Sequence, residues 1–103
     1  MQGPFKTLRV LGKRVRIIWD SATIPDDQWG EWDFNTHTLH VNKEGPIDEL
    51  RETVLHETLH ALESMHGFTI PEATVRSMSS GLFAVLRDNK AFAKWILEES
   101  DDE

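Results

Sequence analysis

The spacing of hydrophobic residues changes along the chain from a period of two to a helical period. In the first forty residues, short runs alternate between apolar and polar positions, which is typical of half-buried strands. Gly12 and the pair Asn35-Thr36 separate neighbouring runs and are suited to turns. We therefore expect a small antiparallel sheet of three or four strands, at Thr7 to Leu11, Arg14 to Trp19, Gly30 to Phe34 and Thr38 to Val41.

From Gly45 onwards, apolar residues recur at the spacing of a helix. Pro46 suits the first turn of a helix, and Asp48 and Glu49 suit the positive end of its dipole. Apolar positions continue on more than one side as far as His66, and Gly67 is a good residue to end the helix. The pattern predicts one long helix that is buried on more than one side.

Two further helices are predicted after a short turn. Thr69 can cap the first of them, which places Glu72 at the third helical position and ends the helix at about Arg87. Asp88-Asn89 interrupts the pattern, and a third helix covers Ala91 to Leu97. The apolar residues of both helices are expected to face inward: Val75, Met78, Leu82, Val85, Leu86, Phe92, Trp95 and Ile96.

The order of the elements predicts an α+β fold, in which a sheet is followed by one long helix and two supporting helices. No repeat or linker divides the 103 residues, so residues 1–103 are expected to form a single small domain. Hydrophobic residues make up 39% of the chain, including four Trp and five Phe, which is enough for a packed core.

Composition narrows the choice of partners and compartment. A net charge of −7 argues against nucleic-acid binding, and the acidic end from Glu98 to Glu103 is expected to be a solvated tail. No apolar run is long enough to cross a membrane, and the first residues lack a signal-peptide core. Cysteine is absent, which excludes disulfides and fits a reducing compartment. A cytoplasmic protein without a membrane anchor is expected.

The candidate chemistry is concentrated in the predicted long helix, in the segment His56-Glu57-Thr58-Leu59-His60. Residues four apart lie on one helix face, so His56 and His60 can bind one metal ion. In this HExxH pattern, the glutamate contacts metal-bound water and removes its proton. The pattern predicts one Zn²⁺ ion with Glu57 as general base, whereas the competing interpretation is an ordinary solvated helix face.

A zinc site of this kind needs a third protein ligand. Glu72 is the preferred candidate, because the turn at Gly67 would fold its helix back across the first. His66 is the alternative, but the continuous helix through Glu63 would turn it away from His60. Glu63 itself lies too far along the helix axis to share the ion and is better suited to an outer role.

A residue that stabilises a developing oxyanion is harder to assign. Tyrosine, a frequent choice, is absent from the chain. His37, His40 and Arg76 are the remaining candidates.

From Gly30 to about Trp95, the chain resembles the minimal gluzincin-type zinc metallopeptidases, and most closely the small phage-encoded and ImmA/IrrE-like peptidase domains. The resemblance is carried by Gly30 to Phe34, Thr38 to Val41, Val54 to Leu62, Gly67-Phe68 and Pro71 to Val75. It implies a zincin-like fold, zinc ligands at His56, His60 and Glu72, and a general base at Glu57. It also implies that Thr38 to Val41 borders the substrate cleft and that a phage-encoded member would act in the host cytoplasm.

The sequence thus predicts a zinc-dependent peptidase that acts on a peptide or protein substrate. Two alternatives remain. One is a non-catalytic phage accessory protein that zinc stabilises. The other is a metal-dependent endoribonuclease of the YbeY type, which would use His56, His60 and His66. The substrate and the oligomeric state stay open.

Overall fold

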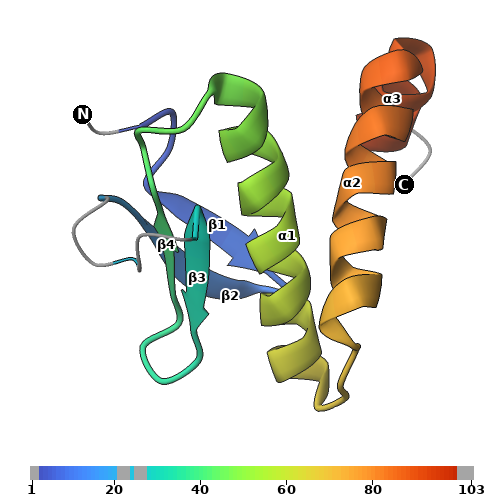
Figure 1. Cartoon of the computed structure of the whole chain (residues 1–103). Coiled ribbons are helices and arrows are strands. Elements are labelled where there is room, and N and C mark those ends of the chain that lie inside the picture. Colours follow the sequence, from blue (N-terminus) through green and yellow to red (C-terminus); the bar gives the residue numbers. More distant parts are fainter. Residues whose placement is uncertain (1–2, 21–23, 25–27, 100–103) are drawn as a thin grey trace.

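The computed structural model describes residues 3–20, 24 and 28–99, which form a four-stranded sheet followed by three helices (Figure 1). The α+β prediction is confirmed, and each strand ends within one residue of its predicted limits. The part of the acidic tail from residue 100 onwards lies outside the described residues. The elements are β1 (Thr7–Val10), β2 (Lys13–Trp19), β3 (Gly30–Asp33), β4 (Thr38–Val41), α1 (Ile47–His66), α2 (Glu72–Asp88) and α3 (Lys90–Leu97).

The sheet is mixed, so the prediction of a purely antiparallel sheet is wrong in one place. The strand order is β1-β2-β4-β3, with antiparallel β1–β2 and β3–β4 pairs. The two hairpins join through a parallel pairing of β2 with β4, in which Ile17 lies opposite Leu39. Alternating polarity identifies strands but not their neighbours, so the sequence pattern could not reveal this pairing. The arrangement leaves β3 at an edge of the sheet.

Both hairpins turn where the sequence predicts. Leu11 and Gly12 have φ angles of 52° and 79°, which is the positive pair that a two-residue type I′ turn requires. In the β3–β4 turn, the Asp33 carboxylate accepts a hydrogen bond from the Asn35 backbone N–H at 2.9 Å.

The core lies between the sheet and α1. Trp32 connects the edge strand to this helix, because its indole N–H donates to the Ser64 hydroxyl at 2.9 Å. The opposite side of α1 packs against α2, where Leu59 and Val75 are buried. The prediction of a long helix buried on two sides is confirmed. Buried apolar side chains of the main cluster are Val10, Val15, Ile17, Trp19, Leu39, Val41, Leu50 and Ala61.

The turn between α1 and α2 positions the start of the second helix. Gly67 ends α1 in the left-handed conformation (φ 78°, ψ 25°), and its N–H donates to the Glu63 carbonyl at 2.9 Å. The predicted N-cap at Thr69 is wrong, because α2 begins at Glu72 and Pro71 occupies the cap position. Proline disfavours a helical conformation in the preceding residue, which argues against a helix that includes Ile70, and Pro71 itself has an extended ψ of 144°. Glu72 is therefore the first helical residue, and its carboxylate takes no part in a capping box.

The predicted inward face of α2 and α3 is largely exposed. Val75 is fully buried against α1, but Met78, Leu82 and Val85 are exposed. Among the described elements, α3 makes close contacts with α2 alone, so nothing covers Trp95. Helical periodicity identified an apolar stripe but not whether the chain supplies a surface to cover it. No helix in the described part of the chain is long and apolar enough to cross a membrane.

Candidate metal centre

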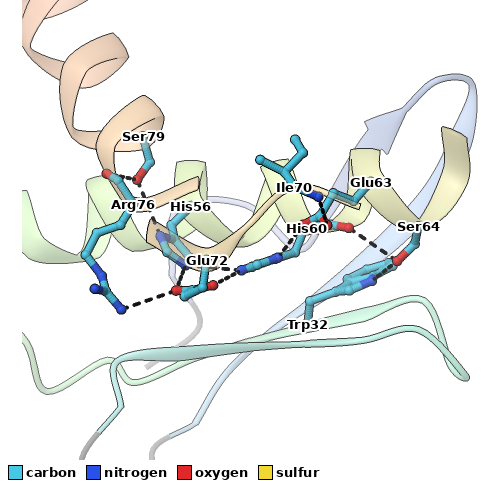
Figure 2. A network of polar contacts seen from close by, with 9 residues as sticks. All are labelled: Trp32, His56, His60, Glu63, Ser64, Ile70, Glu72, Arg76 and Ser79. Atoms are coloured by element: carbon cyan, nitrogen blue, oxygen red, sulfur yellow. Dashed lines mark hydrogen bonds and ion pairs between the residues drawn. The ribbon is translucent and has the colours of Figure 1, made fainter. Parts of the chain in front are cut away.

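Three predicted metal ligands meet at one point between α1 and α2 (Figure 2). His56 Nε2 lies 3.0 Å from Glu72 Oε2, and His60 Nε2 lies 2.8 Å from Glu72 Oε1. The two Nε2 atoms are 3.2 Å apart. One turn of α1 separates the imidazoles, and the position of Glu72 at the first residue of α2 places its carboxylate across from both. The structure therefore brings together the three residues that the sequence selected.

Glu63 fixes the orientation of the His60 ring. Its Oε1 lies 2.8 Å from His60 Nδ1, while its Oε2 accepts a hydrogen bond from the Ile70 backbone N–H at 2.7 Å. The bonds from Ile70 and His60 hold the pKa of Glu63 below its usual range. An ionised Glu63 can only accept, so His60 Nδ1 is the donor, and the neutral tautomer with this proton has the lone pair that a metal ion needs on Nε2. The outer role predicted for Glu63 agrees with this geometry.

Ser79 orients the ring of His56 in a similar way, and the sequence analysis did not predict this role. Its buried hydroxyl lies 3.4 Å from His56 Nδ1 and donates its single hydrogen to the Arg76 carbonyl at 3.1 Å. The His56 Nδ1–H must then be the donor to Ser79, which leaves the Nε2 lone pair free. Burial lowers the pKa of His56 and favours the neutral ring. Ser79 lies seven residues after Glu72 and so shares its helix face. This spacing is the one sequence feature that could have indicated a role for Ser79 near the proposed site.

The donor set at this point suits a divalent cation. Two Nε2 atoms and one carboxylate converge, and the Nδ1 partners of both rings favour the neutral tautomer that has its lone pair on Nε2. Arg76 Nη2 approaches Glu72 Oε2 only at 3.5 Å and its side chain is 69% exposed, so it neutralises this cluster weakly. Neutral imidazole nitrogen and carboxylate oxygen are ligands that Zn²⁺ accepts, and three of them leave a fourth position open. The residues present fit such an ion.

Glu57 is a buried carboxyl beside this cluster. Only 9% of the residue is exposed, and burial raises its pKa to about 7. The Trp32 backbone N–H donates to it, which partly offsets the cost of burying its charge. Glu57 does not converge with the three ligand atoms but lines the same cleft. A carboxyl with a pKa near 7 is suited to exchanging a proton at neutral pH.

The cluster lies in a cleft with a volume of about 970 Å³. Its walls are formed by α1, the start of α2 and the edge strand β3 at Gly30 to Trp32. The sequence-based expectation that Thr38 to Val41 borders the cleft is wrong. These residues form β4, which lies one strand further inside the sheet. The aromatic side chains of Trp29 and Phe68 contribute to the lining.

The remaining candidates are placed differently. His66 lies at the end of α1 with its ring 5.5 Å from that of Phe68, and it is not part of the three-residue cluster. His37 stacks on Trp32 at 5.9 Å, and neither His37 nor His40 lines the cleft. Of the three oxyanion candidates, Arg76 alone lines it.

Comparisons of the chain with protein-family profiles, curated proteins and solved structures found no match.

Proposed function

We propose that this protein is a zinc-dependent peptidase with His56, His60 and Glu72 as its metal ligands. The observation that carries the proposal is the convergence of two imidazole Nε2 atoms and one carboxylate beside a buried glutamate. When bound there, Zn²⁺ would lower the pKa of a water molecule and polarise a carbonyl group of the substrate.

Glu57 is the general base of the proposed reaction. Its carboxylate accepts a proton from the attacking water and later donates it to the leaving amine. Burial supports this role, because it brings the carboxyl pKa to about 7, where the group can both take and return a proton. The hydrogen bond from the Trp32 backbone N–H holds the carboxyl in the cleft.

The edge strand β3 favours a peptide as the substrate. Its cleft-lining residues belong to a strand at the edge of the sheet, where backbone N–H and C=O groups that do not pair with β4 can pair with an extended chain, except for the Trp32 N–H, which donates to Glu57. Arg76 is the candidate for stabilising charge on the substrate carbonyl, because it lines the cleft and carries a permanent positive charge. The cysteine-free composition agrees with action in the cytoplasm.

The open ligand position argues against a purely structural zinc site. Structural zinc is almost always held by four protein ligands, whereas the group in the described part of the chain contains three. A three-histidine ribonuclease centre is also disfavoured, because His66 lies outside the cluster.

Hydrolysis of an unstructured protein such as casein, and of mixed peptide libraries, tests the proposal. Zinc-loaded protein should release new amino termini, and Glu57→Gln should reduce the rate about 10²–10⁴-fold while it keeps the metal. Glu44→Gln, an exposed change in the loop before α1, is the matched control and should keep full activity. Equal rates for wild type and Glu57→Gln, or no release by fully loaded wild type, would refute the peptidase assignment.

A further inference from the structure

The edge strand β3 runs alongside α1 and in the same direction (Figure 1). Near the start of the strand, a Cβ at Gly30 would lie 2.5 Å from Thr53 Cγ2. Two residues later, the Trp32 indole N–H donates to the Ser64 hydroxyl at 2.9 Å. The two histidines of the metal centre lie between Thr53 and Ser64 on α1. A peptide that pairs with the edge of β3 would therefore lie along α1 and pass these histidines.

The cleft is acidic where it extends toward the start of α1. Six glutamates line it in the described part of the chain, and three of them are accounted for by the metal centre and its neighbouring base. The other three are Glu31 on β3 and Glu49 and Glu52 on α1. Arg76 is the one lysine or arginine among the described lining residues, and it approaches Glu72 instead. The cleft therefore does not neutralise the negative charge at this end.

The carboxylates of Glu49 and Glu52 are available to a ligand. Within the described residues, neither side chain makes a hydrogen bond or an ion pair. Arg51, which lies between them in the sequence, is paired with Asp48 at 3.1 Å. The helix dipole favours an acid in the first turn and accounts for Glu49, but its effect fades beyond that turn and does not account for Glu52. A carboxylate in this position can bind a cationic group of a substrate.

Trp29 adds an aromatic ring to the same end of the cleft. The ring lies close to the loop just before α1, because a Cβ at Gly45 would be 3.0 Å from it. The residue is nevertheless 43% exposed, and it lines the cleft. An indole face attracts ammonium and guanidinium groups, and it also packs against the alkyl stems of lysine and arginine. A ring near two carboxylates suits a basic side chain better than an apolar or acidic one.

The opposite end of the cleft has a different character. The described lining residues that follow His60 on α1 and in the next turn are Glu63, Ser64, Phe68 and Thr69. The Glu63 carboxylate is already bonded to the His60 ring at 2.8 Å. This end therefore presents hydroxyl groups and an aromatic ring, but no carboxylate without a partner. A basic side chain would be favoured on one side of the metal centre and not on the other.

The helical rise gives the spacing between these carboxylates and the metal centre. Glu52 precedes His56 by four residues and Glu49 precedes it by seven, which corresponds to about 6 Å and about 10 Å along α1. An extended chain advances about 3.3 Å per residue, so these distances span about two and three residues of a substrate. Side chains at these positions of a bound peptide would lie beside Glu52 and Glu49.

We propose that the cleft selects peptides with a lysine or arginine two or three residues from the scissile bond, on the side that lies toward the start of α1. Glu49, Glu52 and Trp29 are the residues that bind the basic side chain. The same carboxylates repel acidic substrates, so they act for one class of peptide and against another. The proposal rests on the peptidase function proposed above and names the substrate class of that site.

Cleavage of a randomised decapeptide library by zinc-loaded wild type tests the proposal. Mass spectrometry of the products should show lysine and arginine enriched at the second or third residue on one side of the cleaved bond, and not on the other. Cleavage at many bonds without this enrichment would overturn the selectivity and leave the peptidase assignment intact.

Substitution of the two carboxylates shows whether they are the cause. Kinetics on paired peptides, with lysine or glutamine at the enriched position, give the ratio of the two kcat/KM values. Glu49→Gln/Glu52→Gln should lower this ratio at least tenfold, and Glu49→Lys/Glu52→Lys should favour glutamate at that position instead. Glu98→Gln, an exposed change after the end of α3, is the control and should keep the wild-type ratio. A ratio that is the same in all four proteins would refute the role of Glu49 and Glu52.

A binding measurement separates this proposal from the peptidase assignment. Zinc-loaded Glu57→Gln is mixed with fluorescent decapeptides in which one lysine is moved through an alanine–serine background, each beside its glutamine counterpart. Fluorescence anisotropy should show at least tenfold tighter binding for the best lysine peptide, and the added changes Glu49→Gln/Glu52→Gln should abolish this preference. That result without hydrolysis by wild type would keep the selectivity and reject the peptidase. Equal affinities for lysine and glutamine peptides would overturn the selectivity.

Discussion

Glu63 Oε1 lies 2.8 Å from Nδ1 of His60, on the opposite side of the imidazole ring from Glu72. The other oxygen of Glu63 accepts the Ile70 backbone N–H, and its own carbonyl accepts the N–H of Gly67. Glu63 therefore holds the ring of one proposed ligand, His60, and also shapes the turn that positions another, Glu72. The geometry of the site depends on these outer contacts as much as on the ligands themselves.

We expect Glu63→Gln to weaken zinc binding about 10–100-fold. The amide offers one acceptor oxygen in place of two, so it cannot serve His60 and the Ile70 N–H together. Competition with a fluorescent chelator would measure the affinity. Glu44→Gln removes a carboxylate that lies away from the site and should bind zinc as wild type does. An unchanged affinity in Glu63→Gln would contradict the role assigned to this carboxylate.

Ser79→Ala should also weaken zinc binding, by about tenfold or more. The buried hydroxyl is the acceptor for His56 Nδ1–H, and alanine leaves this group without a partner. The neighbouring Ser80 is exposed on the same helix, so Ser80→Ala is a closely matched control. The same chelator competition should separate the two variants. If both retain wild-type affinity, Ser79 does not position His56.

Zinc should raise the melting temperature of wild type and do so far less in Glu72→Ala. A ligand at a thousand times its dissociation constant stabilises by about 4 kcal/mol, which corresponds to roughly 15–30 °C for a domain of this size. His66→Ala should keep the full zinc-dependent rise, because His66 lies outside the cluster. Calorimetry with and without zinc makes the comparison. The reverse outcome, with loss in His66→Ala and none in Glu72→Ala, would favour a three-histidine site.

The sequence predicted the parts of the site that depend on local spacing. His56 and His60 share a face because they are one turn apart, and Gly67 ends α1 because left-handed backbone suits glycine. The location of Glu72 across from both followed from the shortness of the turn. Secondary-structure limits were also predicted well, because periodicity and turn residues act within a few positions.

Features that depend on distant segments were not predicted. The parallel β2–β4 pairing and the edge position of β3 are set by how two hairpins pack together, which alternating polarity does not encode. Ser79 could not be distinguished from an ordinary helix residue, because its role depends on a contact with the ring of His56, which lies on another helix. Trp95 was assigned to the core on periodicity alone, although the described part of the chain offers no surface to bury it.

The metal-free protein should lose stability between about pH 4.5 and 7 because of Glu57. Burial raises its pKa from 4.5 to about 7, so the folded state binds a proton that the unfolded state releases over this range. The contribution of Glu57 to the free energy of unfolding is therefore most favourable below pH 4.5 and becomes less favourable as the pH rises to about 7. A shift of this size corresponds to about 3 kcal/mol at most.

Glu57→Gln should remove that pH dependence. In urea denaturation with a strong chelator present, the unfolding free energy of the variant should increase relative to that of wild type as the pH rises from 4 to 8. Other groups titrate in both proteins, so the difference between their unfolding free energies isolates Glu57. A difference that is the same at both pH values would show that this carboxyl is not buried in the metal-free protein.

Gly30→Ala should destabilise the protein by roughly 1–3 kcal/mol, because β3 passes very close to α1 at this point. A Cβ at Gly30 would lie 2.5 Å from Thr53 Cγ2 and 3.2 Å from Glu57 Cγ. The strand would have to move, and the Trp32 N–H that holds Glu57 would move with it. Gly81→Ala is the contrasting change, since a Cβ there meets no atom within 4 Å. In a helix interior this substitution should stabilise by up to about 1 kcal/mol.

A second substitution, at Thr53, shows whether the close approach of β3 to α1 causes the loss of stability in Gly30→Ala. Thr53→Ser removes the Cγ2 methyl that the new Cβ would meet, so it should recover a large part of the stability lost in Gly30→Ala. Chemical denaturation of wild type, both single variants and the double variant gives the coupling free energy, which should reach about 1 kcal/mol for two groups in direct contact. Peptidase activity should follow the same order, because the strand that moves also positions the carboxyl of Glu57. Additive effects on unfolding would mean that β3 and α1 are not in close contact at Gly30.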